Sequence, residues 1–296
     1  MKKREFVNVP IRSIQNIQNS AGTSMFQIST IKEEKSNKKL SVEAHRHDFY
    51  HIMFIKEGIG VNTIDFKSYE VKPNSIFFIS PGQVHALEIS ADAEGYVISF
   101  NSDFYLLTDS LQKLLDFPFF HSMNNTPVVY IEETDVAIKY TWEEIYDEYQ
   151  TDQTNKATIL RALLEVLLIR VSRMYAQPLK EEEPAYLTYQ LRKLETLIDT
   201  HFKELRVLNE YAELMHISPK HLNSLCKKGL NKTVTNLIHE RTLIEAKRLL
   251  LFTNNSIAEI AHELGFTDKS YFMRFFKKHM NLTAQNYRIK KEVIEE

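Results

Sequence analysis

The chain has 296 residues, of which 43% are hydrophobic, and a formal net charge of −2. This length is comfortable for two globular domains, and the single cysteine, Cys226, excludes a disulfide framework and indicates a reducing compartment. The richest apolar run, residues 162–171, is interrupted by Glu165 and Arg170 and is too short to cross a bilayer. We therefore expect a cytoplasmic protein that makes no contact with membranes.

The first part of the chain is rich in short predicted strands. Over residues 45–55 the side chains alternate in character, which places six of them on one face of a strand. These six are His45, His47, Phe49, His51, Met53 and Ile55. Further strands are predicted at residues 61–65, 68–71, 75–80, 85–89 and 95–100. Short strands at this spacing, separated by Gly, Pro and Asn turns, favour a barrel or a sandwich.

Two helices are predicted after the strands, over residues 134–150 and 157–175. The second carries a continuous apolar stripe at helical spacing. The stripe consists of Leu160, Leu163, Leu164, Leu167, Leu168, Val171 and Met174. We expect the stripe to pack onto the strands, and it is wide enough to serve a second contact as well.

A linker is predicted over residues 177–185, where Pro178, Pro184 and a run of charged side chains discourage regular structure. Residues 1–176 then form one domain and residues 186–296 the other. Residues 184–296 contain 18 Lys and Arg against 13 Asp and Glu, a net charge of +5, whereas residues 1–183 carry −7. This asymmetry predicts that only the C-terminal domain contacts phosphate groups.

The last hundred residues contain one motif twice. Leu222, Leu225, Cys226, Lys227, Lys228, Asn231 and Thr233 recur 50 positions later as Phe272, Phe275, Phe276, Lys277, Lys278, Asn281 and Thr283. Each copy predicts a short helix, a tight turn and a second helix with polar residues in its first turns, which is the helix-turn-helix pattern. Between the copies, residues 233–252 predict one amphipathic helix of about 30 Å, close to the ~34 Å turn of B-DNA.

Local signals mark the helix boundaries of both copies. They are Ser256, Glu259, Gly265 and Asp268 in the second copy, and His216, Ser218 and Pro219 in the first. Ser256 and Glu259 have the spacing of a capping box, and Gly265 is the residue type that most easily takes a positive φ at a helix end. Ser218 is predicted to cap the second helix of the first copy, and Thr267 or Asp268 that of the second copy.

The second copy and its flanks resemble the signature of the AraC-type (AraC/XylS) transcriptional regulators. The matching residues are 256–261, 265–272, 274–278, Thr283 and 287–288, and the match covers residues 190–290. Asn281 and Ala284 stand where the family usually has Gly and Pro. The resemblance implies sequence-specific binding to double-stranded DNA by two helix-turn-helix units, with homodimerisation through the helices of the first domain and RNA polymerase as a further candidate partner.

We call the second helix of each copy its reading helix. Eight polar residues on the two reading helices are candidates for base contact. They are Lys220, His221, Asn223, Ser224, Lys269, Ser270, Tyr271 and Arg274. Arg274 is the strongest, because a guanidinium group pairs bidentately with guanine. A second group is predicted near phosphates, with plain solvation as the alternative. These residues are Lys227, Lys228, Lys277 and Lys278.

The strand region resembles the cupin barrel that precedes the DNA-binding domain in many AraC-type regulators. The resemblance rests on residues 45–47, Gly58 and residues 81–85. It implies the fold class α+β with two domains, a cupin-like β-barrel followed by helices and then an all-α double helix-turn-helix domain. The predicted effector pocket is lined by His45, His47, Phe49, His51, Met53, Phe77, His85 and Tyr96, with Phe78 and Phe100 as further candidates.

The resemblance to metal-binding cupins also places four imidazoles at ligand positions. They are His45, His47, His51 and His85, and His51 stands where those cupins have Glu. Regulators of this family mostly keep the barrel as a pocket without metal. We therefore expect no cofactor, and we expect these side chains to form hydrogen bonds or to line a pocket for an organic ligand.

We expect a DNA-binding transcription regulator, not an enzyme, whose barrel senses a small molecule and thereby alters DNA binding. One alternative is a cupin metalloprotein or metalloenzyme with a structural helical tail, for which near-stoichiometric metal would be the discriminating observation. A second alternative is a DNA-binding scaffold that senses nothing, whose DNA affinity would be the same under every metabolite.

Overall fold

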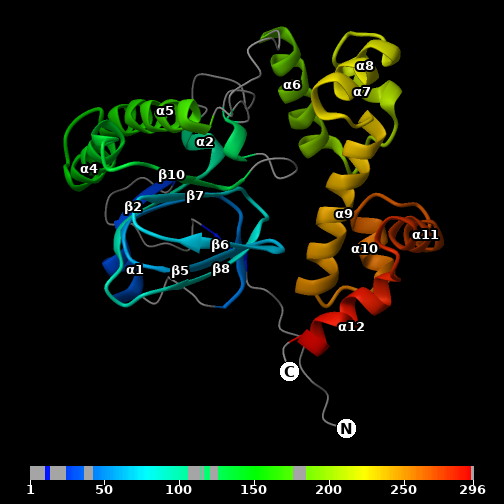
Figure 1. The fold of residues 1–296 in the computed structure, drawn as a ribbon, viewed down its shortest axis with the longest axis horizontal. Helices are drawn as coiled ribbons and strands as arrows, with labels where there is room; N and C mark the ends of the chain where they lie inside the picture. Colours follow the sequence, from blue (N-terminus) through cyan, green and yellow to red (C-terminus); the bar gives the residue numbers. More distant parts are fainter. Residues whose placement is uncertain are drawn as a thin grey trace. The chain divides into compact units, whose positions relative to one another are not determined.

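The computed structural model describes residues 11–13, 25–36, 43–105, 114, 117–120, 126–175 and 185–294 (Figure 1). These residues belong to two compact units, which divide between residues 182 and 183. Most of the predicted linker, residues 177–185, lies outside the described residues, and helix α6 begins at Ala185.

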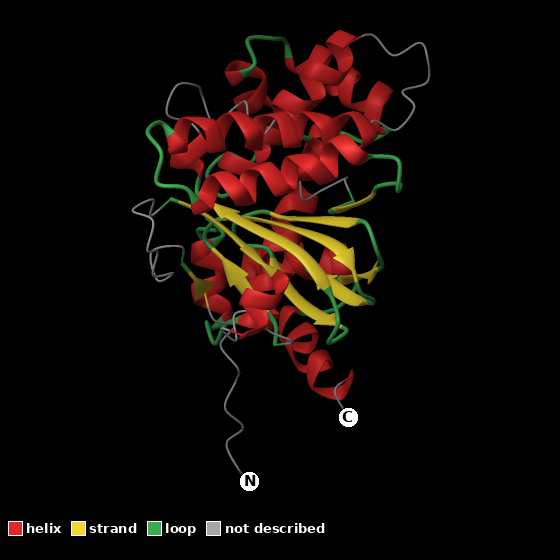
Figure 2. Ribbon diagram, turned by 90° about the vertical axis from the view of Figure 1, so that its left-hand side faces the viewer, coloured by secondary structure: helices red, strands yellow, loops and turns green. Residues whose placement is uncertain are grey.

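Two five-stranded sheets build the N-terminal unit (Figure 2). The first has the order β1 (Ile11–Arg12), β3 (His45–His47), β8 (Val84–Ile89), β5 (Gly60–Ile64) and β6 (Lys67–Val71). The second has the order β10 (Val128–Tyr130), β7 (Ser75–Ile79), β4 (Tyr50–Glu57), β9 (Glu94–Phe100) and β2 (Phe26–Thr30). Neighbouring strands pair antiparallel except β1 and β3, which are parallel.

Both faces of strand β4 are buried, against different partners. Met53 and Ile55 join an interior cluster with side chains from both sheets, including Ile64 and Leu87. Ile52 and Phe54 join a second cluster on the other face, which is covered by α4 (Val136–Gln150) and α5 (Lys156–Tyr175). Figure 1 shows these two helices beside strands β7, β10 and β2. Burial on both faces stabilises this sheet, because the apolar side chains of each face are removed from water.

The prediction of one strand over residues 45–55 is wrong. The segment forms two strands, β3 and β4, which belong to different sheets and are separated at Asp48 and Phe49. The Asp48 amide donates to the Arg12 carbonyl (3.3 Å), so the chain turns a corner between the sheets there. The predicted shared face nevertheless persists around this corner, because the His47 ring contacts both Phe49 and His51.

Three residues predicted to line the interior face the helices instead. Phe78 and Phe100 lie in the helix-covered cluster, and Tyr96 packs beside it, stacked with Trp142. The pattern misled because β4, β7 and β9 are apolar on both faces, so alternation does not distinguish the interior from the side under α4 and α5. Met53 and Phe77 do belong to the interior cluster.

Several short elements were not predicted. They are β1, β2, β10, α1 (Ile31–Ser36), α2 (Ser102–Tyr105) and the 3-10 helix η2 (Pro118–Phe120). Strand β2 is held by five register pairs with β9, from Phe26 opposite Phe100 to Thr30 opposite Tyr96. Its pairing therefore depends on residues about seventy positions away, which no local pattern shows.

Seven helices make up the described C-terminal unit. They are α6 (Ala185–His201), α7 (Leu208–Leu214), α8 (Pro219–Leu230), α9 (Val234–Phe252), α10 (Ile257–Glu263), α11 (Lys269–Met280) and α12 (Ala284–Ile294). Helices α7 with α8, and α10 with α11, correspond to the two predicted helix-turn-helix units, and α9 is the predicted helix between them. Helices α6 and α12 were not predicted. Among the described residues, no helix is both long and apolar enough to span a bilayer.

Candidate DNA interface and ligand site

The second helix-turn-helix unit has the predicted caps. The Ser256 amide donates to Glu259 Oε2 (2.6 Å), and Ser256 Oγ accepts from the Glu259 amide (3.2 Å). The Asp268 carboxylate accepts from the amides of Ser270 and Tyr271, at 2.9 and 3.2 Å. These bonds lower the pKa of Asp268, because they favour its charged form. Both helices therefore begin where the sequence predicts.

The first unit is capped more weakly at its first helix. Val207 stands at the position of Ser256 and offers no side-chain oxygen, so only the Glu210 carboxylate reaches back, to the Val207 amide (3.0 Å). Ser218 caps α8 by accepting from the His221 amide (3.2 Å), with Pro219 at the first helical position. Both reading helices, α8 and α11, end at an Asn in the left-handed conformation, Asn231 (φ 52°) and Asn281 (φ 53°).

The two reading helices expose their polar faces and bury their apolar ones. Leu222, Leu225, Cys226, Phe272, Phe275 and Phe276 are buried. Seven of the eight candidate base-contact residues are exposed: Lys220, His221, Ser224, Lys269, Ser270, Tyr271 and Arg274. The four candidate phosphate-contact residues, Lys227, Lys228, Lys277 and Lys278, are exposed as well. This pattern leaves each polar face open to a ligand.

Asn223 is engaged inside the protein. Its Oδ1 accepts from the Val234 amide (3.2 Å) at the start of α9, and the side chain is only partly exposed. In the second copy the equivalent position is Met273, which cannot make this bond. A role for Asn223 in base contact is thus limited to its amide NH2 group.

Cys226 is a buried apolar-face residue of α8. Burial raises the pKa of its thiol to about 12, so the reactive thiolate is scarce at neutral pH. This environment agrees with a packing role.

Helix α9 is fixed to α6 by a compact charge network. Arg241 donates to Asp199 (2.6 Å) and to Glu245 (3.0 Å), and Arg248 also donates to Glu245 (2.9 Å). Burial by itself would raise the pKa of Glu245, but Arg248 and Arg241 lower it to about 2. The guanidinium of Arg241 also lies over the Phe202 ring, 4.1 Å from its centroid. The linker helix is thus attached to α6, the helix that precedes the first unit.

Four buried histidines meet inside the N-terminal unit. His45 and His47 come from β3, His51 from β4 and His85 from β8. The Nε2 atoms of His47 and His85 lie 2.8 Å apart, so one of the two rings must carry the proton between them. His45 Nδ1 lies 2.9 Å from the Glu43 carbonyl, and His51 Nδ1 lies 3.0 Å from Ser99 Oγ.

All four imidazoles are held neutral at physiological pH. Burial is the largest cause and mutual repulsion adds to it in three of them: the pKa of His45 is lowered to about 4, that of His51 to about 3, and those of His47 and His85 fall well below the usual value. Neutral imidazole is the protonation state that binds metal ions.

Three of the four histidines have the arrangement of a metal site. One ligand atom from each of His45, His47 and His85 lies within 4.8 Å of the others. Two nitrogens bound to one tetrahedral Zn2+ lie about 3.3 Å apart, so small side-chain rotations would bring these rings into a coordination sphere. His51, the fourth candidate, is not in this group but stacks on His47 at 4.7 Å.

Several buried polar atoms near this cluster have no hydrogen-bond partner within the described part of the chain. Among the described residues, Nδ1 of His47, Nδ1 of His85 and both side-chain polar atoms of Asn62 are buried and without a hydrogen-bond partner. Asn62 lies on β5 opposite Leu87, one inward-facing position along the strands from His85. An unpaired buried amide costs about 1–3 kcal/mol, so Asn62 is a candidate to anchor a polar ligand. The sequence analysis missed Asn62, although its place in an alternating strand is visible.

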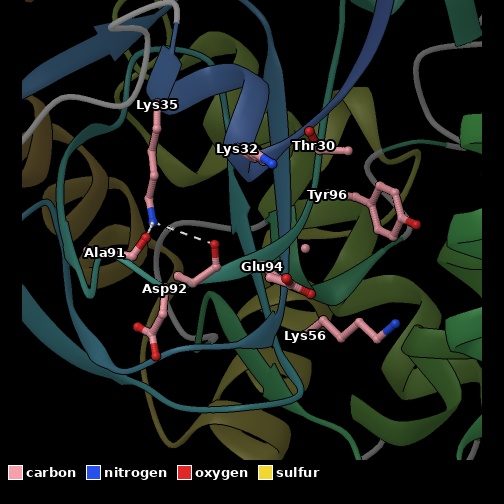
Figure 3. Close-up of a pocket in the computed structure, with 10 residues that line it drawn as sticks. Thr30, Lys32, Lys35, Lys56, Ala91, Asp92, Glu94 and Tyr96 are labelled. Atoms are coloured by element: carbon pink, nitrogen blue, oxygen red, sulfur yellow. Dashed lines mark hydrogen bonds between the residues drawn. The ribbon is translucent and has the colours of Figure 1, made fainter.

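A separate cavity of about 440 Å³ opens beside α1 and the start of β9. Three lysines line it, Lys32, Lys35 and Lys56, together with Asp92, Glu94 and Tyr96 (Figure 3). The Lys35 ammonium is already bonded to the carbonyls of Ser90 (2.8 Å) and Ala91 (3.0 Å). Tyr96, predicted for the interior pocket, therefore belongs to this outer cavity.

The apolar stripe of α5 is used within its own unit. Leu160, Leu164, Leu167, Leu168 and Val171 are buried in the helix-covered cluster, and Leu163 packs against it. The helix exposes Ile159, Val166, Ile169 and Met174, of which Met174 was predicted to belong to the packed stripe. The residues predicted to pair across a dimer are thus covered by the barrel, and a dimer contact on α5 would have to use the exposed set.

Comparison with known proteins agrees with this two-part organisation. A model described as "AraC-like ligand binding domain" matches residues 31–175, and one described as "Helix-turn-helix domain" matches residues 211–290. The HTH-type transcriptional activator RhaR of Mannheimia succiniciproducens is 23% identical over 268 residues, 88% of this chain and 92% of that protein. An uncharacterised HTH-type regulator of Bacillus subtilis, YdeC, is 22% identical over 83% of this chain and 86% of its own length.

Comparison with solved structures gives partial and nearly complete matches. The C-terminal domain of AraT, a response regulator from Geobacillus stearothermophilus, is 30% identical and covers 36% of this chain and 88% of its own, with a TM-score of 0.34. ToxT from Vibrio cholerae is 15% identical and covers 90% of this chain and 98% of its own, with a TM-score of 0.41. From the two domain models, together with the relative RhaR, the chain belongs to the AraC-type DNA-binding transcription regulators and carries an AraC-like ligand-binding domain.

Proposed function

We propose that α8 and α11 enter successive major grooves on one side of the duplex. The observation that carries this proposal is the repeat itself: two capped helices with exposed polar first turns, joined by the 19-residue helix α9. A helix of this length spans about 28 Å, against ~34 Å for one turn of B-DNA. The two helices would then read two short blocks about one turn apart.

The residue roles within this proposal follow from side-chain chemistry. Arg274 reads a guanine, and Lys220, His221, Ser224, Lys269, Ser270 and Tyr271 contribute further base contacts. Asn223 is assigned a smaller part, because its carbonyl oxygen is bonded to Val234. Lys227, Lys228, Lys277 and Lys278 contact phosphates and make the affinity dependent on salt.

For the N-terminal unit we propose a sensor that binds a small molecule in the interior and acts on DNA binding without catalysing a reaction. His45, His47, His51, His85, Phe49, Met53 and Phe77 line that site, and Asn62 supplies an unpaired donor and acceptor to anchor the ligand. The regulator works in the cytoplasm as a homodimer, through the exposed face of α5, and RNA polymerase is its candidate protein partner. The domain boundary lies within residues 177–185.

The test of the DNA-reading proposal is selection of bound sequences from a random duplex pool, with the full-length chain at a stated salt concentration. We expect an enriched site with two short blocks about one helical turn apart. An Arg274→Ala chain should lose preference in one block only. Equal enrichment patterns for both chains would remove Arg274 from base reading.

A second candidate function is metal sensing by the interior unit. It rests on His45, His47 and His85, whose ligand atoms lie within 4.8 Å of one another. These three rings would hold a borderline cation such as Zn2+ and leave a coordination position open, which would supply a Lewis-acid centre for an anionic ligand. The Glu43 carbonyl would orient the His45 ring from outside.

Metal content after incubation with Zn2+ and gel filtration tests this candidate. We expect about one ion per chain in the wild type, lost in His85→Ala and retained in His262→Ala, which removes an exposed histidine outside the cluster. Wild-type protein that retains no zinc would eliminate the metal site and leave the organic effector.

A further inference from the structure

The loop that leads into the first reading unit contacts the second unit directly, in addition to the connection through α9. The Arg206 side chain, in the loop between α6 and α7, donates a hydrogen bond to the Leu264 carbonyl at the end of α10. Its guanidinium also lies over the Phe266 ring, 3.9 Å from the centroid. Lys203, in the same loop, lies 3.8 Å from the Glu263 carboxylate. We call these contacts, with Gly265, the Arg206 clamp.

Gly265 gives independent evidence that the clamp is a close contact. Its φ is +75°, and a Cβ at this position would lie 1.8 Å from the Lys203 carbonyl oxygen. In the first copy, the turn residue His216 adopts a similar φ of 55° with a full side chain. A left-handed turn alone therefore tolerates a side chain in this chain. The approach of the loop at Lys203 is what excludes one at Gly265.

One side of the clamp is anchored to α7, the first helix of the first unit, and the other side to the reading helix α11. On the first side, the Arg206 amide donates to Glu210 (2.7 Å) on α7, and Tyr211 donates to the Leu205 carbonyl (3.1 Å). On the second side, Phe266 packs against Tyr271 and Phe272 of α11, with centroids 5.7 and 5.2 Å apart. These contacts connect α7 to α11 through hydrogen bonds and packed side chains.

We propose that Arg206 is a positioning residue that sets the spacing of the two half-sites. One helix joining two bodies leaves them free to bend and twist at its ends, whereas a second attachment at Arg206 closes the structure into one rigid reader. The clamp would then determine how strongly the affinity depends on the distance between the two half-sites. The side chains of α8 and α11 would determine which bases are preferred. This inference rests on the proposed reading of DNA by both helices.

The experiment measures affinity for the selected site and for the same site with one base pair inserted between its blocks. The insertion moves the second block by about 3.4 Å and rotates it by about 35°. For the wild type we expect about a 10- to 100-fold loss, equivalent to losing contacts in one block. For Arg206→Ala we expect weaker binding to the parent site but only about a twofold further loss on insertion.

Matched controls separate positioning from charge and from folding. Arg192→Ala removes an exposed cation of the same unit, and His216→Gly changes the equivalent turn of the first copy; both should keep the wild-type penalty for insertion. Arg206→Lys keeps a donor but loses the planar stack, and should give an intermediate penalty. Thermal unfolding checks that each chain is folded.

Four outcomes contradict the proposal. A folded Arg206→Ala chain with the full wild-type penalty would show that the clamp does not set spacing, and a wild type that tolerates the insertion would show that no spacing is set. Loss of all binding by folded Arg206→Ala and Arg206→Lys would make Arg206 a DNA contact. An Arg192→Ala chain that also binds the site with the inserted base pair with little loss would show that the reduced penalty in Arg206→Ala comes only from the loss of a positive charge. Failure of the underlying DNA-reading proposal is distinguishable, because the wild type would then yield no two-block site.

Discussion

The two helix-turn-helix units share a pattern of residues but differ in how they are attached to the rest of the C-terminal unit. The first unit is fixed to α9 by the Asn223 bond to Val234, and the preceding helix α6 is fixed to α9 by the Arg241–Asp199 ion pair. The second has Met273 in place of Asn223, contacts α9 through the Phe275 ring against His239, and meets the loop between α6 and α7 at Gly265. The repeated residues specify two helix-turn-helix units of one kind. The residues that differ between the copies specify how each unit is attached to the rest of the C-terminal unit.

Gly265→Ala should produce the largest loss of stability. A positive φ for alanine and an overlap with the Lys203 carbonyl together should lower the free energy of unfolding by about 2–4 kcal/mol. The matched change in the first copy, His216→Ala, should cost less than about 1 kcal/mol. Urea unfolding measures both, and equal costs would abolish the distinction between the two turns.

Acid should weaken the ion pairs that Glu245 makes with Arg241 and Arg248 within α9. Because the pKa of Glu245 is lowered to about 2 in the folded chain, its ion pairs stabilise at neutral pH and above an unfolded pKa of about 4.3. That stability, about 2–3 kcal/mol, is lost as pH falls from about 4.5 to about 2. Unfolding of wild type and Glu245→Gln at pH 7 and pH 3 measures this contribution. The difference in free energy of unfolding between the two chains should be smaller at pH 3 than at pH 7. A difference that does not change with pH would contradict the role of the Glu245 ion pairs.

Arg274→Ala and Ser224→Ala compare the same position in the two readers. The loss of a bidentate guanidinium should cost about 1–3 kcal/mol of binding free energy and relax one block of the site. Loss of the Ser224 hydroxyl should cost less, because a hydroxyl makes a single and less selective contact. Affinities for sites mutated in each block check this, and a larger effect at Ser224 would reverse the proposed ranking of the two readers.

The caps of the reading helices should have similar and smaller effects. Ser218 and Asp268 each accept at the start of a reading helix, so Ser218→Ala and Asp268→Ala should each lower the free energy of unfolding by about 1 kcal/mol. Chemical denaturation with each variant provides the measurement. A negligible cost in one copy would mean that tertiary packing, and not the cap, begins that helix.

Local signals predicted the C-terminal unit well because its helices begin and end through contacts within a few residues. Ser256 with Glu259, and Asn281 in the left-handed conformation, are examples that the sequence displays directly. The clamp was not predicted, since Arg206 and Leu264 are 58 positions apart and nothing local couples them. Helix α6 escaped notice because it lies outside the repeat.

In the N-terminal unit the positions of the strands were predicted better than the faces on which their side chains lie. The positions of β5 to β9 were predicted to within one residue, but the face of Tyr96, Phe78 and Phe100 was not. Which side of a doubly apolar strand becomes the interior depends on where α4 and α5 pack, and this is decided by the whole fold. The convergence of His45, His47 and His85 was anticipated from a resemblance, and their distances required the structure.

The most direct test of the account is selection of bound duplexes by full-length protein, with wild type, Arg274→Ala and Ser224→Ala run side by side at one salt concentration. The account predicts a two-block site for the wild type, with one block relaxed by Arg274→Ala and the other by Ser224→Ala. A single enriched block, or no enrichment by folded wild-type protein, would contradict the claim that this chain reads DNA with both helices.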